Sequence, residues 1–258
     1  MTAAPQVIGS RDNTLLKDLR RLAQDSTAYR KQGRVWLEGD HLCRAVLARG
    51  LRPALAVFSE SCWMQARPEW SAAAGKNVIV ADALFAGLSA LESPAAMAFI
   101  IQLPASTALD PLAATVVLDR LQDAGNVGAI LRSAGAFGFR QVVALKGTAA
   151  LWSPKVLRAG MGAHFGLRLI EGLETASLSA LAIPLLTTSS HHGQAVHQAA
   201  LPWPCAWAFG HEGQGVGDAV TTLASQSVRI AQPGGEESLN VACAAAICLH
   251  ASAVGNSG

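Results

Sequence analysis

The stretch TVVLDRLQDAGNVGAILRSAGAFGFRQVVAL, residues 115–145, decides the fold class. It opens with an apolar, β-branched run (115–119) and closes with a second one (141–145), as buried strands do. Residues 126–137 between them have the small and apolar side chains of a helix. Strands that alternate with helices form parallel sheets covered on both faces. The stretch therefore predicts an α/β fold.

The same alternation continues downstream. Strand-like runs recur as PLLTT (184–188), AWAFG (206–210) and SVRIA (227–231). Helices are predicted between most of the strands and at the end of the chain, over 153–160, 175–181, 216–225 and 238–251. Such a sheet binds ligands beyond the carboxyl ends of its strands.

A smaller α/β unit precedes this sheet. Its predicted strands are 34–39, 54–59, 77–82 and 97–102, and its predicted helices are 12–24 and 41–50, with a short helical segment before the last strand. The segment LPASTALDP (103–111) has prolines at both ends and small polar residues between them, which is typical of a linker. We therefore expect two domains, residues 1–104 and 112–258.

Composition limits the class of protein. Of the 258 residues, 51% are hydrophobic and 15% are charged, so the chain can bury a sizeable core. No apolar run approaches the roughly 20 residues of a membrane span. The N-terminus lacks a basic segment followed by an apolar one, as in a signal peptide. We expect a cytoplasmic protein without membrane contact.

The positive charge gathers near the N-terminus. Residues 10–52 hold ten of the 20 Lys and Arg against five acids, a local balance of +5 in a chain of net charge +2. A basic region on a near-neutral body favours a phosphate-rich partner such as RNA. The same pattern also fits the solvated face of an amphipathic helix.

Other chemistries lack their signatures. The five cysteines are odd in number and include no CxxC pair, so reduced, buried thiols are expected. The histidines of HHGQAVH (191–197) have no nearby carboxylate, so no metal site is predicted. No GxGxxG follows the strand at 115–119, which argues against a nicotinamide or flavin enzyme.

Three segments place polar residues at strand ends: DRLQDAGNVGAILRSAGAFGF (119–139), FGHEGQGV (209–216) and RIAQPGGEESLNVACAA (229–245). The glycines in the last two allow the backbone to approach a ligand closely. A helix start offers N–H donors to a pocket. Each segment alone also reads as an ordinary turn or a capped helix.

Together and in this order, the segments resemble the three motifs of the SpoU/TrmH family of SPOUT RNA methyltransferases. The N-x-G-x-x-x-R motif is met by Asn126, Gly128 and Arg132. The G-x-E-G loop is met by Gly210, Glu212 and Gly213. The I-P-x-x-G-x-x-x-S-L-N-V motif is met by Ile230, Gly234, Ser238, Leu239, Asn240 and Val241. Ala231 and Gln232 depart from it, since proline and an apolar residue usually stand there.

Two further stretches extend the resemblance. SPKVLRAGMGAHF (153–165) is similar to the family's K-x-x-R-x-S-x-G stretch. RKQGRVWLEGDHLCRAVLARG (30–50) is similar to the start of the family's small substrate-binding domain, with Trp36 in the aromatic place. That domain is a ribosomal-protein-like α/β fold that grips RNA, which agrees with the charge bias.

The resemblance implies an enzyme that transfers a methyl group from S-adenosylmethionine to a ribose 2′-hydroxyl of RNA. It implies a C-terminal trefoil-knotted domain and a homodimer. The implied catalytic residues are Arg132, Asn126, Glu212, Ser238 and Asn240. The implied cofactor-binding residues are Thr187, Thr188, Gly210, Glu212, Gly213, Ile230, Gln232, Leu239 and Asn240. The implied RNA-binding residues are Arg20, Arg30, Arg34, Arg132, Lys155 and Arg158.

Several alternatives stay open at this point. Large-subunit ribosomal RNA is the first choice of substrate and transfer RNA the second. A role in protecting the ribosome against an antibiotic is compatible with the same motifs. The rival functions are an RNA- or ribosome-binding protein without catalysis and a methyltransferase that acts on a base.

Overall fold

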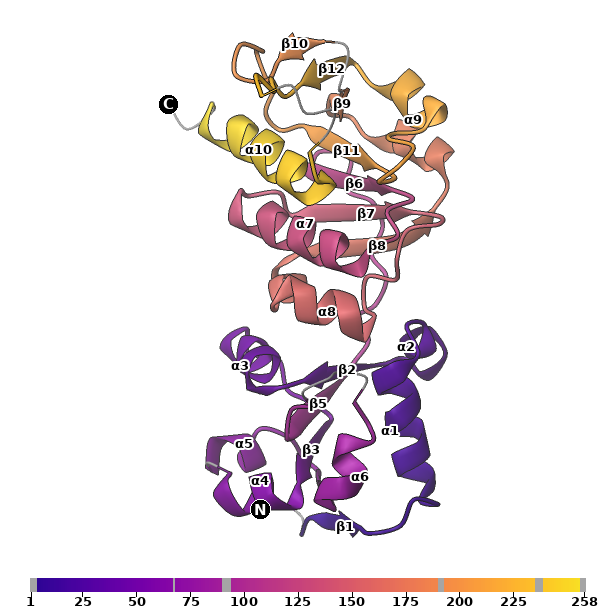
Figure 1. Cartoon of the computed structure of the whole chain (residues 1–258), viewed down its shortest axis with the longest axis vertical. Coiled ribbons are helices and arrows are strands. Elements are labelled where there is room, and N and C mark those ends of the chain that lie inside the picture. The colour runs from indigo at the N-terminus through magenta and orange to yellow at the C-terminus, as the bar shows by residue number, and fades with distance from the viewer. Residues whose placement is uncertain (1–3, 67, 90–93, 190–192, 235–238, 256–258) are drawn as a thin grey trace. The chain divides into compact units, whose positions relative to one another are not determined.

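The computed structural model describes residues 4–66, 68–89, 94–189, 193–234 and 239–255. By its contacts the chain divides into two compact units, each built around its own sheet (Figure 1). The first unit is residues 1–105 with 152–165, and the second is residues 106–151 with 166–258. Residues 152–165 thus pack with the first unit, although they lie between two strands of the second in the sequence.

The first unit has a five-stranded sheet in the order β1-β4-β3-β5-β2. Its strands are β1 (Gln6–Ile8), β2 (Arg34–Glu38), β3 (Leu55–Ser59), β4 (Asn77–Val80) and β5 (Met97–Gln102). Strand β5 runs antiparallel to β2 and β3. The four predicted strands are confirmed. Strand β1 was not predicted, because three residues are too few to show a pattern.

Helices surround this sheet. They are α1 (Thr14–Gln24), α2 (Ala28–Gln32), α3 (Asp40–Ala48), α4 (Glu60–Gln65), α5 (Pro68–Ala72), α6 (Asp82–Ala86) and α8 (Pro154–Gly160), with the 3₁₀ turn η1 (Ala163–Gly166) after α8. Asn13 starts α1, because its side chain accepts the Leu16 N–H. The periodic leucines of α1 are buried, as a helix face packed on a core requires.

The second unit has a seven-stranded sheet in the order β10-β12-β9-β11-β6-β7-β8, in which every pair is parallel. Its strands are β6 (Thr115–Asp119), β7 (Gln141–Leu145), β8 (Arg168–Leu173), β9 (Leu185–Thr188), β10 (Gln194–Ala195), β11 (Ala206–Gly210) and β12 (Gln226–Arg229). The predicted parallel α/β sheet is confirmed. Strand β8 was missed because it lies at the sheet edge and is only partly buried.

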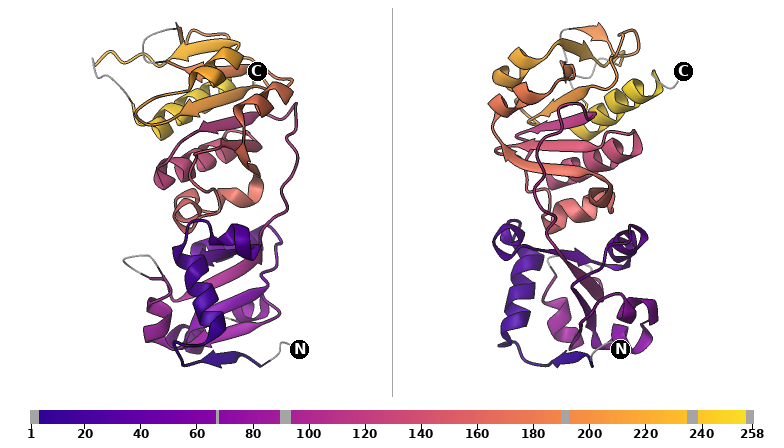
Figure 2. Two further views of the ribbon diagram at one scale, coloured as in Figure 1. Left: turned by 90° about the vertical axis from the view of Figure 1, so that its right-hand side faces the viewer. Right: turned by 180° about the vertical axis from the view of Figure 1, so that it is seen from behind.

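Helices cover both faces of the second sheet. On one face lie α7 (Ala124–Ala136) and α10 (Val241–Val254), side by side (Figure 1). On the other lie η2 (Thr175–Ala180) and α9 (Asp218–Leu223) (Figure 2). Their residues Leu178 and Val220 are part of the buried core on that face. Strand β11 contacts the helices on both faces of the sheet, because successive side chains of a strand point to opposite faces. Ala206 and Ala208 belong to the buried core on the side of α9. The Trp207 indole N–H points to the other side and donates to Ser252 Oγ on α10 at 2.9 Å.

Some predicted boundaries were wrong. Helix α10 begins at Val241, not at 238, because the Asn240 side chain caps it. The segment predicted as helical over 175–181 is confirmed, as the 3₁₀ helix η2. All five cysteines are free, as predicted, but only Cys43, Cys205 and Cys248 are buried, while Cys243 is exposed.

Candidate functional site

A cavity of about 640 Å³ opens beyond the carboxyl ends of the second unit's strands. Strands β6 and β11 end in register, with Asp119 beside Gly210, and β9 ends at Thr188. This is the edge where a parallel sheet binds ligands. The cavity is lined by Thr188, Ser189, Gly210, His211, Glu212, Gly213, Gln214, Gly215, Val216, Ile230, Gln232, Leu239, Asn240, Val241 and Ala244.

A chain of three side chains joins the three motif segments at this cavity. Asn240 Nδ2 donates to Asn126 Oδ1 at 2.9 Å, and Asn126 Nδ2 donates to Glu212 Oε1 at 3.3 Å. Asn240 also starts α10, because its Oδ1 accepts the N–H groups of Ala242 and Cys243. Asn126 is free to bridge because Asp123, not Asn126, caps α7.

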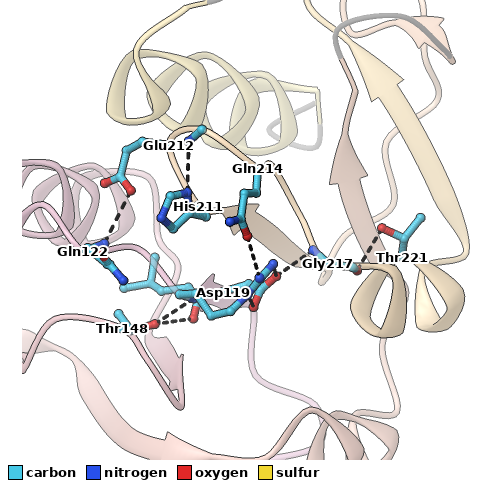
Figure 3. A network of polar contacts seen from close by, with 11 residues as sticks. Asp119, Gln122, Thr148, His211, Glu212, Gln214, Gly217 and Thr221 are labelled. Carbon is cyan, nitrogen blue, oxygen red and sulfur yellow. Dashed lines mark hydrogen bonds and ion pairs between the residues drawn. The ribbon is translucent and has the colours of Figure 1, made fainter.

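The carboxylate of Glu212 holds the loop after β11 against the loop after β6. It accepts the backbone N–H of Asp123 at 3.2 Å and that of Gln122 at 3.4 Å; the second contact is drawn in Figure 3. Partial burial by itself would raise the pKa of Glu212. The hydrogen bonds, from its own backbone and from Asp123, Asn126 and Gln122, outweigh burial and lower that pKa below its ordinary value.

This lowered pKa predicts an acid-sensitive site. A carboxyl whose pKa is lower in the folded chain stabilises the fold above its unfolded pKa, and the contribution is lost as the pH falls through the folded pKa. We expect wild type to lose stability below about pH 4, where an unfolded glutamate gains its proton. Thermal unfolding between pH 7 and pH 3 measures this loss. In Glu212→Gln, which cannot ionise at this position, the unfolding temperature should fall less steeply with pH than in wild type. An equally steep fall in both proteins would contradict a lowered pKa of Glu212.

The loop between β11 and α9 is folded tightly on itself. A Cβ on Gly210 would lie 2.1 Å from the carbonyl carbon of Gly215, so this position needs glycine. Gly215 has a φ of +67°, and a short antiparallel bridge joins it to His211. His211 Nδ1 accepts the Gly213 N–H at 3.0 Å. The loop thus presents a fixed surface to the cavity.

The structure places most of the predicted cofactor residues on the cavity wall. All line it except Thr187, which is 2% exposed and lies inside the sheet. Ser238 lies outside the described residues. The sequence prediction named no α10 residue among the cofactor-binding residues, whereas Val241 and Ala244 also line the cavity. Val241 and Ala244 lie three residues apart in α10 and therefore share one face of the helix, which is the sequence signal that points to them.

The predicted RNA-binding residues are divided between the units. Arg132 lies in α7 of the second unit, and its exposed side chain makes no hydrogen bond or ion pair to another described residue. Arg20 and Arg34, in the first unit, donate to the Gly87 carbonyl at 3.2 Å and to Gln32 Oε1 at 2.7 Å. The other three, also in the first unit, are exposed: Arg30, Lys155 and Arg158.

The cavity wall favours a cationic ligand with N–H donors. Gln232 Oε1 is buried and has no hydrogen-bond partner among the described residues. Glu212 is a carboxylate, and the described lining includes no Lys or Arg to hold a phosphate. Within the described ranges, no cluster of His, Cys, Asp and Glu could hold a metal ion, and no helix is long and apolar enough to cross a membrane.

Comparison with known proteins identifies relatives that share this site's segments. Residues 113–250 match the family model described as the SpoU rRNA Methylase family. The chain is 30% identical to an uncharacterized tRNA/rRNA methyltransferase of Synechocystis, over 94% of this chain and 92% of that protein. It is 26% identical to the 23S rRNA (guanosine(2553)-2′-O)-methyltransferase of Bacillus subtilis, over 94% of this chain and 97% of that protein.

The fold is shared along nearly the whole chain. The crystal structure of an RNA 2′-O ribose methyltransferase superposes with a TM-score of 0.78 and 30% identity. The superposition covers 96% of this chain and 98% of that one.

Proposed function

The chain belongs to the SpoU rRNA methylase family, and on this premise we propose that it transfers a methyl group from S-adenosylmethionine to a ribose 2′-hydroxyl of RNA. The observation that carries the proposal is the chain Asn240–Asn126–Glu212. It brings together residues 114 and 86 positions apart at the rim of one cavity. Three family motifs are thereby assembled into one polar site, which an RNA-binding protein without catalysis would have no need to keep.

The cavity fits the cofactor. S-adenosylmethionine, when bound, supplies a methyl group on a positively charged sulfur whose departure leaves a neutral thioether. The described wall offers the unpartnered Gln232 Oε1 and the carboxylate of Glu212, which suit a ligand with amino groups and a positive charge. Gly210, which lines the cavity, lets the backbone of Gly215 and Val216 pass close to the end of β11 and so shapes the wall. We assign the cofactor to Thr188, Gly210, Glu212, Gly213, Ile230, Gln232, Leu239 and Asn240.

No metal or acid is needed for a neutral leaving group, so the protein's tasks are alignment and help with the hydroxyl proton. Asn126 and Asn240 fix the rim against Glu212. We assign to the exposed Arg132 the RNA phosphate beside the target and the developing alkoxide charge. Arginine stays protonated in proteins, which makes it a poor base, so we assign the hydroxyl proton to the neighbouring phosphate or to water, which accepts it as the oxygen–methyl bond forms.

We propose large-subunit ribosomal RNA as the substrate. The support is that the B. subtilis relative methylates 23S rRNA and matches this chain over both units. Transfer RNA is the alternative. The first unit, with its surplus of Lys and Arg, would grip the RNA. A homodimer, a trefoil knot and a cytoplasmic location complete the proposal, the last because rRNA is modified where ribosomes are assembled.

Methyl transfer from labelled S-adenosylmethionine to unmodified total RNA tests the function. We expect the label in large-subunit rRNA, in dinucleotides that resist alkali, because a 2′-O-methyl group removes the hydroxyl that alkaline cleavage requires. Label in alkali-labile mononucleotides would instead identify a base methyltransferase. Label in transfer RNA would favour the alternative substrate. An absence of both transfer and cofactor binding would leave the RNA-binding protein.

A further inference from the structure

The strand β6 ends in an unusual backbone conformation. Arg120 has a φ of +58°, and Met161 is the other described non-glycine residue with a positive φ. This left-handed conformation strains an arginine, while a glycine would adopt it freely. Such strain persists where the surroundings over-determine it. Here the Arg120 N–H donates to Thr148 Oγ1 at 3.1 Å, and that hydroxyl donates to the Leu118 carbonyl at 2.9 Å.

The strained backbone aims the guanidinium at two partners. Nε and Nη2 of Arg120 donate to the two carboxylate oxygens of Asp119 at 2.9 and 3.2 Å. Nη1 donates to Gln214 Oε1 at 3.1 Å, at the tip of the β11–α9 loop. Asp119 Oδ2 also accepts the Gly217 N–H at 2.7 Å, at the end of that loop. Figure 3 shows the contact between Asp119 and Gly217, with Gln214 close by.

The ion pair of Asp119 and Arg120 is partly buried and tightly packed. The Asp119 side chain is 5% exposed, so it needs the hydrogen bonds that it accepts. The hydrogen bonds and the charge of Asp119 raise the pKa of Arg120 above its ordinary value, so the guanidinium is charged at every working pH. A Cβ on Gly217 would lie 2.9 Å from Arg120 Nη2 and 3.2 Å from Asp119 Oδ2, so a larger residue there would displace the guanidinium.

We propose that Asp119 and Arg120 form a clamp that positions the cofactor loop of residues 211–217 from the end of β6. Glu212 ties the start of the loop, Arg120 holds Gln214 and Asp119 holds Gly217. Gln214 and its neighbours line the cavity, whereas Arg120 does not. Arg120 is therefore a positioning residue that acts on the cofactor through the loop. This inference rests on the proposed function, since it assumes that the cavity binds S-adenosylmethionine.

The clamp should affect binding more than folding. The Arg120 side chain is 37% exposed and is partly solvated, whereas the Asp119 side chain is 5% exposed, so removing the guanidinium costs some stability at the carboxylate, which keeps the Gly217 N–H. Replacing Arg120 by glycine also relieves the backbone strain, which offsets the lost hydrogen bonds. The variant Arg120→Gly therefore separates the two roles.

Calorimetric titration of the full chain with S-adenosylmethionine tests the clamp. For Arg120→Gly we expect the Kd and the KM for S-adenosylmethionine to rise about tenfold. The kcat of methyl transfer should be nearly unchanged, and the unfolding temperature should be close to that of wild type. Met161→Gly is the matched control, because it relieves the same kind of strain in the first unit and leaves the cavity wall intact. Its Kd should equal that of wild type. Combined with Gln214→Ala, Arg120→Gly should add a smaller loss than it causes alone.

Each outcome bears on one claim. If wild type binds neither S-adenosylmethionine nor S-adenosylhomocysteine, the proposed function fails and the clamp fails with it. If wild type binds and Arg120→Gly binds equally well, the clamp alone is overturned. Should Arg120→Gly unfold, Arg120→Lys decides, because lysine keeps the charge but cannot span both Asp119 and Gln214. An unchanged Kd in Arg120→Lys would then overturn the clamp.

Discussion

Gly210→Ala is expected to weaken cofactor binding strongly and to destabilise the second unit. The new Cβ would lie 2.1 to 2.2 Å from three backbone atoms of Gly215 and Val216, which no flexible side chain can relieve. The loop has to move away from the end of β11, and overpacking of this kind costs about 2–3 kcal/mol. For a chain of this length, that corresponds to an unfolding temperature lower by about 5–10 °C. The Kd for S-adenosylmethionine should rise by about 100-fold or more.

Gly213→Ala is the matched comparison within the same loop. The Cβ there would meet the His211 imidazole at 3.8 Å, an ordinary contact, and the φ of Gly213 is not in the left-handed region. We expect an unfolding temperature within about 1 °C of wild type, as for other uncrowded surface changes. Calorimetry and thermal unfolding of both variants make the test. Equal unfolding temperatures for Gly210→Ala and Gly213→Ala would show that the close approach to Gly215 does not constrain the loop.

Arg132→Ala is expected to lower methyl transfer by about 100- to 1,000-fold, the usual loss when one group that stabilises developing negative charge is removed. Its cofactor affinity should stay at the wild-type value, because Arg132 does not line the cavity. Its stability should also be unchanged, since the side chain is exposed and has no hydrogen bond to another described residue. Single-turnover transfer with saturating cofactor measures the loss. A parallel loss of cofactor affinity would contradict the assignment.

Two further measurements define what Arg132 does. Arg132→Lys keeps the charge but loses the planar fork that grips phosphate at two points, so it should restore only part of the rate. The pH–rate profile tests the alternative in which the arginine removes the hydroxyl proton. That scheme requires the rate to rise across the alkaline range as arginine loses its own proton. A flat alkaline profile supports an arginine that remains charged.

The sequence predicted the second sheet well because its strands are apolar runs buried on both sides. TVVLD and QVVAL are buried at every residue, as strands in the middle of a covered parallel sheet are. Strand β8 did not show it, because an edge strand is partly exposed and RLIEGL mixes charge and glycine into the run. The placement of α8 was equally hidden. Its sequence lies between β7 and β8, while its contacts belong to the first unit.

The sequence likewise determined one part of the candidate site, and the tertiary structure decided the rest. The sequence alone determined the chemical class, because Asn126, Arg132, Glu212 and Asn240 stand in recognisable motifs at strand ends. Only the tertiary structure decided which of them touch: Asn240 bonds to Asn126 and Asn126 to Glu212, while Arg132 stays apart. The clamp of Asp119 and Arg120 on Gln214 was also invisible, since 94 residues separate Arg120 from Gln214. The physical reason is that a motif records side-chain chemistry locally, whereas hydrogen bonds depend on strand register and helix packing between distant segments.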